Sequence, residues 1–137
     1  MTLRLLVNID VPDLDRGVGF YRGGLGFVLR RWLFGHTVAE LTCASVSCFL
    51  IEKRPGTHPV SGHDATRHYA PHWTPLHLDL VVPDVDLALT RAIAAGARIE
   101  TPAADAPFGR IATLRDPFGH GFCLIELADG GYDNVSG

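Results

Sequence analysis

His77 and Asp79 are the two residues of this chain whose types and spacing best suit chemistry. Both lie in the apolar run LHLDLVVPDVD, and side chains two apart on a strand point to the same face. An imidazole beside a carboxylate can bind a metal ion, orient a ligand or transfer a proton. A buried histidine held by a hydrogen bond is the commoner case, so these interpretations stay open at this point.

The run that contains these residues is the second copy of an internal repeat. LLVNIDVPDLD near the N-terminus matches LHLDLVVPDVD at an offset of 71, with Leu, Val, Pro and two Asp in register. Where the second copy has His77 and Asp79, the first has Leu6 and Asn8. In each copy a proline ends a strand, and an aspartate follows that can accept from backbone N–H groups at a helix start. The chain is therefore predicted to use one module twice.

The elements that position these side chains follow from periodicity and turn residues. In the first module we expect a strand, a helix and three more strands, at 3–11, 13–24, 27–34, 36–44 and 46–53. The second module repeats this plan from Leu76, with a helix at 85–95, strands at 98–101, 110–114 and 121–127, a loop at 102–109 and a turn at 116–120. The predicted fold class is α+β, with two tandem βαβββ modules.

We expect a single domain, because 137 residues with 47% apolar and 20% charged residues suffice for one compact core. Its expected parts are module one at 3–53, a connecting loop at 54–75, module two at 76–127 and a frayed polar tail at 128–137. Four histidines lie in the connecting loop, namely His58, His63, His68 and His72. Pro71 disfavours a helix that would join the last two, so we expect exposed loop histidines rather than a metal site.

Charge and composition argue against several classes of partner. The formal net charge is −3 and the longest basic run is Arg30–Arg31, so no nucleic-acid partner is expected. No apolar run approaches the roughly 18 residues that cross a bilayer, and we expect a cytoplasmic protein without a membrane partner. The three cysteines lack CxxC spacing, which predicts small buried side chains rather than disulfides or a thiolate zinc site.

The order of these motifs resembles that of the vicinal oxygen chelate superfamily. The motifs are VPDLD and VPDVD at the helix starts, FYRGGLGF after the first helix and RDPFGHGFCLIEL near the end, and the resemblance covers about residues 3–127. This group includes glyoxalase I, extradiol dioxygenases, fosfomycin-resistance enzymes and the metal-free bleomycin-resistance proteins. The resemblance implies pseudo-twofold symmetry, a cup-shaped mixed sheet and a homodimer.

The resemblance also implies where a metal ion would bind. Mapped without gaps, the ligand positions of the metal-dependent members fall on Leu6, Glu52, His77 and Cys123. Leu6 cannot bind a metal, so Glu52 and His77 form an incomplete set, and no cofactor is expected. A divalent ion remains the alternative, in a rearranged site that adds Asp79.

The resulting prediction is a small-molecule-binding protein of the glyoxalase and bleomycin-resistance type. Its candidate ligand-binding residues are Asn8, Trp32, Glu52, His77, Asp79, Phe108 and Cys123. Further aromatic side chains that could form walls of the site are Phe34, Trp73 and Phe122. If the chain is an enzyme, the resemblance implies a glyoxalase-like lyase or isomerase, or a dioxygenase. Metal-free acid–base chemistry by His77 with Asp79 is a third hypothesis, and no catalytic residue is assigned.

Overall fold

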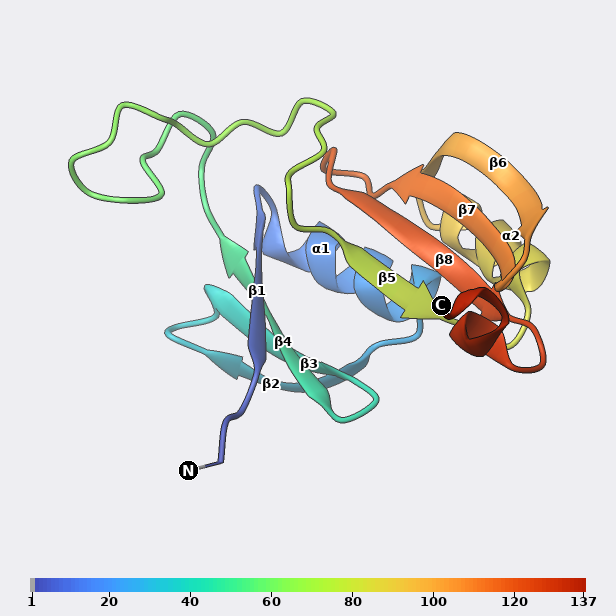
Figure 1. The fold of residues 1–137 in the computed structure, drawn as a ribbon. Helices are drawn as coiled ribbons and strands as arrows, with labels where there is room; N and C mark the ends of the chain where they lie inside the picture. Colours follow the sequence, from blue (N-terminus) through green and yellow to red (C-terminus); the bar gives the residue numbers. More distant parts are fainter. Residues whose placement is uncertain (1) are drawn as a thin grey trace. The chain divides into compact units, whose positions relative to one another are not determined.

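A computed structural model describes residues 2–137, which form two compact units. The first unit ends at Ala70 and the second is Pro71–Gly137, so the division falls inside the segment 54–75. Each unit holds one four-stranded mixed sheet and one α-helix (Figure 1).

The first unit follows the order strand, helix, three strands. Its elements are β1 (Leu6–Val11), α1 (Leu14–Gly19), the π-helical turn η1 (Phe20–Gly24), β2 (Val28–Leu33), β3 (Val38–Cys43) and β4 (Val46–Glu52). The strands lie in the order β1-β4-β3-β2, with β1 parallel to β4 and the other pairs antiparallel.

The second unit repeats this topology. Its elements are β5 (Leu78–Val81), α2 (Val85–Ala94), β6 (Arg98–Ala106), β7 (Gly109–Arg115), β8 (Gly121–Leu127) and the 3-10 helix η2 (Gly131–Val135). The strand order is β5-β8-β7-β6, again with the first and last strands parallel. The predicted fold class, α+β with two tandem βαβββ modules, is confirmed.

Each α-helix begins as its sequence predicts. The carboxylate of Asp13 accepts from the backbone N–H of Arg16 at 3.0 Å, and that of Asp84 accepts from Leu87 at 3.0 Å. Satisfying a free N–H group in the first turn stabilises a helix by about 1 kcal/mol. The two aspartates of the repeat therefore fix where each helix starts.

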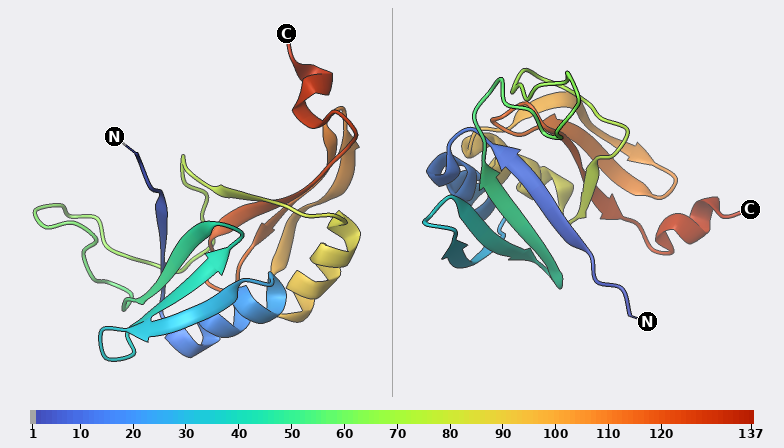
Figure 2. Two further views of the ribbon diagram at one scale, coloured as in Figure 1. Left: turned by 90° about the horizontal axis from the view of Figure 1, so that it is seen from below. Right: turned by 90° about the vertical axis from the view of Figure 1, so that its left-hand side faces the viewer.

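Each helix covers one face of its own sheet, and the core of each unit lies between them (Figure 2). The most deeply buried core side chains of the first unit include Val11, Leu14, Leu41 and Leu50. Those of the second unit include Val85, Leu114, Phe118, Leu124 and Ile125. The opposite, helix-free face of each sheet is therefore where side chains are available for other contacts.

Several predicted boundaries differ from the structure. The first strand starts at Leu6 rather than residue 3, and the helix predicted at 13–24 is α-helical only to Gly19. The predicted loop at 102–109 is mostly strand, because β6 runs to Ala106 and register shifts between Ile99 and Ala104 accommodate Pro102 in the ladder.

The tail is also more ordered than predicted. The side chain of Asn134 donates to the carbonyl oxygens of Asp129 at 2.9 Å and Pro107 at 3.3 Å. The ring of Tyr132 packs against Phe108, with their centroids 5.3 Å apart. These contacts hold η2 against the β6–β7 turn.

The connecting segment contains no helix, and side chains of its part before Pro71 tie it to the first unit. Arg67 Nε lies 2.7 Å from a carboxylate oxygen of Asp10 on β1, and the Tyr69 hydroxyl donates to the carbonyl of Lys53 at 2.7 Å. His72, predicted to be exposed, belongs to the second unit and is half-buried because it pairs with His120 of the same unit. In residues 2–137, no helix is long and apolar enough to cross a membrane.

Candidate functional site

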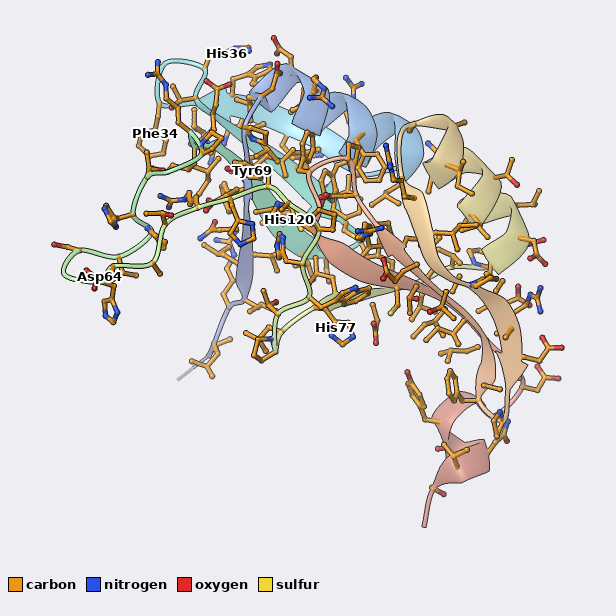
Figure 3. All side chains as sticks on the ribbon, turned by 90° about the horizontal axis from the view of Figure 1, so that it is seen from above. Phe34, His36, Asp64, Tyr69, His77 and His120 are labelled. Carbon is orange, nitrogen blue, oxygen red and sulfur yellow. The ribbon has the colours of Figure 1, made fainter. Side chains whose placement is uncertain are left out.

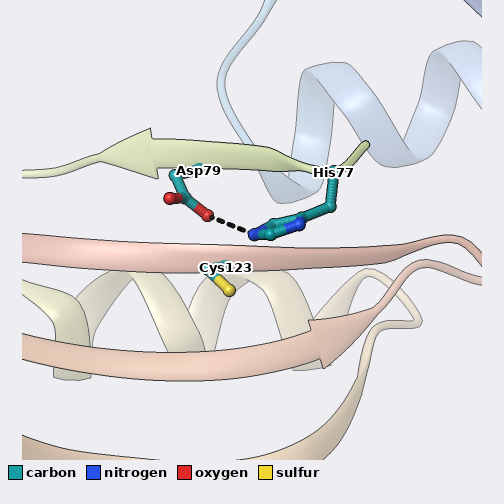
Figure 4. A group of neighbouring side chains, drawn as sticks. All are labelled: His77, Asp79 and Cys123. Atoms are coloured by element: carbon teal, nitrogen blue, oxygen red, sulfur yellow. Dashed lines mark ion pairs between the residues drawn. The ribbon is translucent and has the colours of Figure 1, made fainter. Parts of the chain in front are cut away.

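The helix-free face of the second sheet carries a polar cluster of His77, Asp79 and Cys123. Asp79 on β5 and Cys123 on β8 are cross-strand neighbours, and His77 precedes Asp79 by two residues on the same face. His77 Nε2 lies 3.2 Å from Asp79 Oδ1 (Figure 4). The donor atoms of all three lie within 4.8 Å of one another. The predicted shared face of His77 and Asp79 therefore exists in the structure.

Cys123 is the buried member of this cluster, whereas the side chains of His77 and Asp79 are 42% and 41% exposed. Burial, followed by the negative charge of Asp79 and a hydrogen bond to it, raises the pKa of the Cys123 thiol to about 11. The thiol is therefore protonated at neutral pH and acts as a hydrogen-bond donor to the carboxylate. A thiolate nucleophile is not available here without a change in this environment.

Trp73 borders the cluster on the side of His77. The two rings meet edge to face, with centroids 5.8 Å apart and an interplanar angle of 76°. The indole lies directly on Gly121, the first residue of β8, where an added Cβ would be 2.5 Å from two of its carbon atoms. From the sequence, Trp73 was named only as one of several aromatic side chains that could line the site. Its contact with Gly121 could not be predicted, because the two residues are distant in sequence.

Thr113 on β7 is a neighbour of the cluster that sequence reasoning missed. It pairs with Cys123 across the antiparallel β7–β8 ladder and so shares its face. Its buried hydroxyl oxygen has no hydrogen-bond partner among the described residues. No sequence motif marks this position, and only the strand register reveals it.

Glu52, predicted as a ligand-binding residue together with Asn8, lies on the opposite face of the first sheet from Leu6 and Asn8. Leu6 pairs with Ser47, so Glu52, five residues further along β4, faces the opposite side of the sheet. There its carboxylate accepts from the backbone N–H of Leu14 at 2.9 Å, at the start of α1.

The residue equivalent to Glu52 in the second module is Glu126 rather than Cys123. The carboxylate of Glu126 accepts from the backbone N–H of Val85 at 2.9 Å, at the start of α2. The sequence separation is 38 residues for the first pair and 41 for the second, so the second module has three additional residues. A gapless mapping therefore placed Cys123 opposite the wrong residue.

Trp32 also lies on the other face of its sheet from Asn8. It pairs with Ala39, which pairs with the core residue Leu50 below α1. The indole stacks on His36 with centroids 3.7 Å apart. His36, at the β2–β3 turn, lies beside the first turn of α1 (Figure 3), with Nε2 3.5 Å from an Asp15 carboxylate oxygen. Trp32 and Asn8, both predicted as ligand-binding residues, therefore lie on opposite faces of the first sheet.

Phe108 is not brought to the cluster either. It lies in the β6–β7 turn next to Gly109, which pairs with Leu127 at the far end of β8 from Gly121. Its ring packs on Tyr132 of η2. Asn8 remains exposed on the helix-free face of the first sheet, where it pairs with Phe49.

The donor set of the cluster fits a divalent metal ion of the zinc type. An imidazole nitrogen, a carboxylate oxygen and a sulfur are ligands that such ions take, and catalytic zinc sites usually have three protein ligands. His77, Asp79 and Cys123 would hold the ion, and Cys123 would have to lose its proton. Glu52, held at the start of α1, would not be part of this set.

Residues 6–125 match the sequence profile of the glyoxalase-like domain, and the chain belongs to that family. The expected relationship to the vicinal oxygen chelate superfamily is confirmed. The chain is 38% identical over 127 residues to the anthracycline biosynthesis protein DauV of Streptomyces sp. (strain C5), covering 90% of this chain and 41% of that protein. It is 40% identical over 78 residues to the anthracycline biosynthesis protein DnrV of Streptomyces peucetius, covering 55% and 27%. The chain thus spans less than half the length of these relatives.

Solved structures share the fold at lower identity. TioX from Micromonospora sp. ML1 matches with a TM-score of 0.70 at 24% identity, covering 93% of this chain and all (100%) of that one. TnmS3, an antibiotic-binding protein from Streptomyces sp. CB03234, matches with a TM-score of 0.63 at 21% identity, covering 93% and 99%. The fosfomycin-resistance protein FosX from Listeria monocytogenes matches with a TM-score of 0.72 at 16% identity, covering 99% of both chains.

Proposed function

We propose that this chain binds an aromatic natural product of the anthracycline kind through the helix-free face of its second sheet. The observation that carries this proposal is the row formed by Trp73, His77 and Asp79, three part-exposed side chains above the buried Cys123. Small-molecule sites combine apolar aromatic surface with a few well-placed polar groups, and this row has that composition. The relatives named for anthracycline biosynthesis support the ligand class.

The test is to titrate the purified protein with daunorubicin and to measure the binding affinity by calorimetry. His77→Ala should weaken binding by roughly 1–3 kcal/mol, since it removes a polar partner of the ligand. His63→Ala is the matched control, because His63 is an exposed loop histidine of the first unit. If His77→Ala lowers thermal stability and leaves binding unchanged, the residue is structural and the proposed site is wrong.

A homodimer is the second part of this proposal. The helix-free faces of the sheets carry exposed apolar side chains, including Leu6 (47%), Val28 (54%) and Val81 (62%). Monomeric proteins rarely leave large contiguous apolar patches in contact with water. Pairing two copies through a symmetric interface would bury such residues.

A metal-dependent lyase, isomerase or dioxygenase is the second candidate function, and the His77, Asp79 and Cys123 cluster favours it. A bound divalent ion would polarise a carbonyl or enediolate oxygen as a Lewis acid. The discriminating measurement is metal analysis of protein purified without chelator, followed by a thermal-shift screen with divalent ions. Stoichiometric metal that is lost in Cys123→Ser and His77→Ala, but kept in Glu52→Gln, would replace the binding proposal by this one.

A further inference from the structure

Trp73 can pack directly against the sheet because residue 121 is a glycine and has no side chain. An added Cβ there would lie 2.5 Å from the indole atoms Cδ2 and Cε3 and 2.7 Å from Cε2. Because these adjacent ring atoms are almost equally distant, the glycine lies under the face of the indole rather than at its edge. One face of Trp73 is thus covered by Gly121, while the residue as a whole is still 42% exposed.

The segment that carries Trp73 is fixed by its neighbour His72. The backbone N–H of His72 donates to the carbonyl of Gly119 at 3.0 Å, and His72 Nε2 lies 3.0 Å from His120 Nδ1. The two imidazoles meet edge to face with centroids 4.9 Å apart. Trp73 is therefore held in place before any ligand binds, which reduces the entropy that binding must remove.

The imidazole ring of His77 stands nearly perpendicular to the indole ring of Trp73. Its Nε2 points to the Asp79 carboxylate at 3.2 Å, and a carboxylate can only accept. With Nε2 directed at this carboxylate, Nδ1 is the ring nitrogen that remains to contact a ligand. The ring plane stands at 76° to the indole plane, with the two centroids 5.8 Å apart.

From this geometry we propose that Trp73 and His77 recognise a planar aromatic ligand that carries a free hydroxyl group. This inference rests on the proposed function and specifies its ligand. The ring system stacks on the indole face opposite Gly121, and the hydroxyl group donates to Nδ1 of His77. Gly121 determines specificity indirectly, because any side chain there would lift the indole off the sheet and close the stacking space.

The probes are daunorubicin, 2-hydroxyanthraquinone and 2-methoxyanthraquinone, titrated in the presence of a chelator. The chain has two tryptophans, Trp32 and Trp73. All variants carry Trp32→Phe, so that the tryptophan fluorescence comes from Trp73. Its fluorescence should then be quenched by each bound probe. The hydroxyl probe should bind roughly 5-fold or more tightly than the methoxy probe, as expected for one net hydrogen bond.

Three substitutions separate recognition from folding. Trp73→Leu should weaken all probes by roughly 3- to 10-fold, the range of aromatic stacking, with calorimetry replacing the lost fluorescence. Gly121→Ala should do the same and shift the Trp73 emission, because the added Cβ displaces the indole. The backbone at Gly121 is not left-handed, so alanine adds no backbone strain there. His77→Ala should abolish the preference for the hydroxyl probe while the methoxy probe binds as before.

The outcomes also separate this inference from the proposed function. If daunorubicin does not bind the parent protein, both are overturned. If it binds but Trp73→Leu and Gly121→Ala leave its affinity unchanged, the site lies elsewhere and only the inference fails. Equal affinity for the hydroxyl and methoxy probes would overturn the role of His77. Thermal unfolding of each variant shows that a lost signal does not come from a misfolded chain.

Discussion

Asp79 is the residue that connects the exposed and buried parts of the polar cluster. It faces His77 on its own strand and accepts a hydrogen bond from Cys123 on the next. Burial first, and the charge and hydrogen bond of Asp79 second, raise the pKa of the Cys123 thiol and keep it neutral, while the ion pair with Asp79 orients the exposed imidazole. A substitution of Asp79 should therefore have a measurable effect on both His77 and Cys123.

The reactivity of Cys123 gives the first prediction. With its pKa raised from 9.0 to about 11, its thiolate fraction near pH 8 should be roughly 100-fold lower than that of a free thiol. Asp79→Asn removes the charge that contributes to this rise, so alkylation of Cys123 by iodoacetamide should become faster. Mass spectrometry of the labelled peptides measures this rate.

Cys48 is the internal control for this experiment. Burial, with a smaller contribution from Cys43, raises its pKa also to about 11, and Asp79 takes no part. Its alkylation rate should be the same in both proteins. Equal acceleration at both cysteines would mean that Asp79→Asn loosens the whole fold.

The second prediction concerns alkaline stability. Both thiols hold their proton more tightly in the folded state, with a pKa of about 11 against 9.0 when unfolded. This stabilisation is complete below pH 9.0 and is lost as the pH rises through about 11, because the unfolded chain ionises first. Urea unfolding of the parent and of Cys123→Ala, at about pH 8 and again between the two pKa values, checks this. The variant should lose less stability between the two conditions, and an identical loss would contradict the prediction.

At the scale of elements, a glutamate from the last strand of each module supports the start of its helix. Glu52 reaches Leu14 of α1, and Glu126 reaches Val85 of α2. A carboxylate here accepts a backbone hydrogen bond and also interacts favourably with the positive end of the helix dipole. The two bonds tie helix and sheet together at equivalent points of the two modules.

The third prediction tests this support. Glu52→Ala and Glu126→Ala should each lower the free energy of unfolding by about 1–2 kcal/mol, whereas Gln at either position should cost only about 0.3–1 kcal/mol. Urea denaturation measures both, with Asp64→Ala in the exposed loop as the control. If Glu52→Ala leaves stability unchanged, the glutamate is not a structural partner of α1.

Local sequence patterns were sufficient to predict most of the elements and to single out the three residues of the cluster. The offset of 71 correctly paired Leu6 with His77 and Asp13 with Asp84, because no insertion separates these residues from the repeat. It failed for Glu52, since three additional residues precede β8 in the second module. Trp32 was misplaced because a single residue type does not report which face of a strand is covered by a helix.

Long-range packing explains the remaining errors. The order of η2 depends on Asn134 and Tyr132 contacting the β6–β7 turn, which no local pattern of a Gly-rich tail indicates. His72 pairs with His120, 48 residues further along the chain. The contact of Trp73 with Gly121 was missed for the same reason, because it forms only when β5 and β8 lie side by side.

At the scale of the whole molecule, the two modules share a topology and differ in their chemistry. At equivalent positions the first has Leu6 and Asn8, and the second has His77 and Asp79. The proposed ligand site accordingly uses residues of the second module.

The fourth prediction concerns self-association. Analytical ultracentrifugation at micromolar concentration should show a dimer, and Val81→Asp on the helix-free face of the second sheet should weaken it. Leu87→Asp is the matched control, because Leu87 is 71% exposed but lies on α2. A monomer in all three samples, or weakening by Leu87→Asp alone, would contradict the proposed arrangement.

The loop from Arg54 to His68 has a property that follows from where its ends lie. The Tyr69 hydroxyl bonds to the carbonyl of Lys53, so the loop departs from and returns to the same point of the first unit. Its length therefore does not set the covalent distance to the second module. Since doubling a flexible loop costs only about 0.6 kcal/mol, this loop is a permissive insertion site. A peptide tag introduced between Ser61 and Gly62 should therefore leave both modules folded.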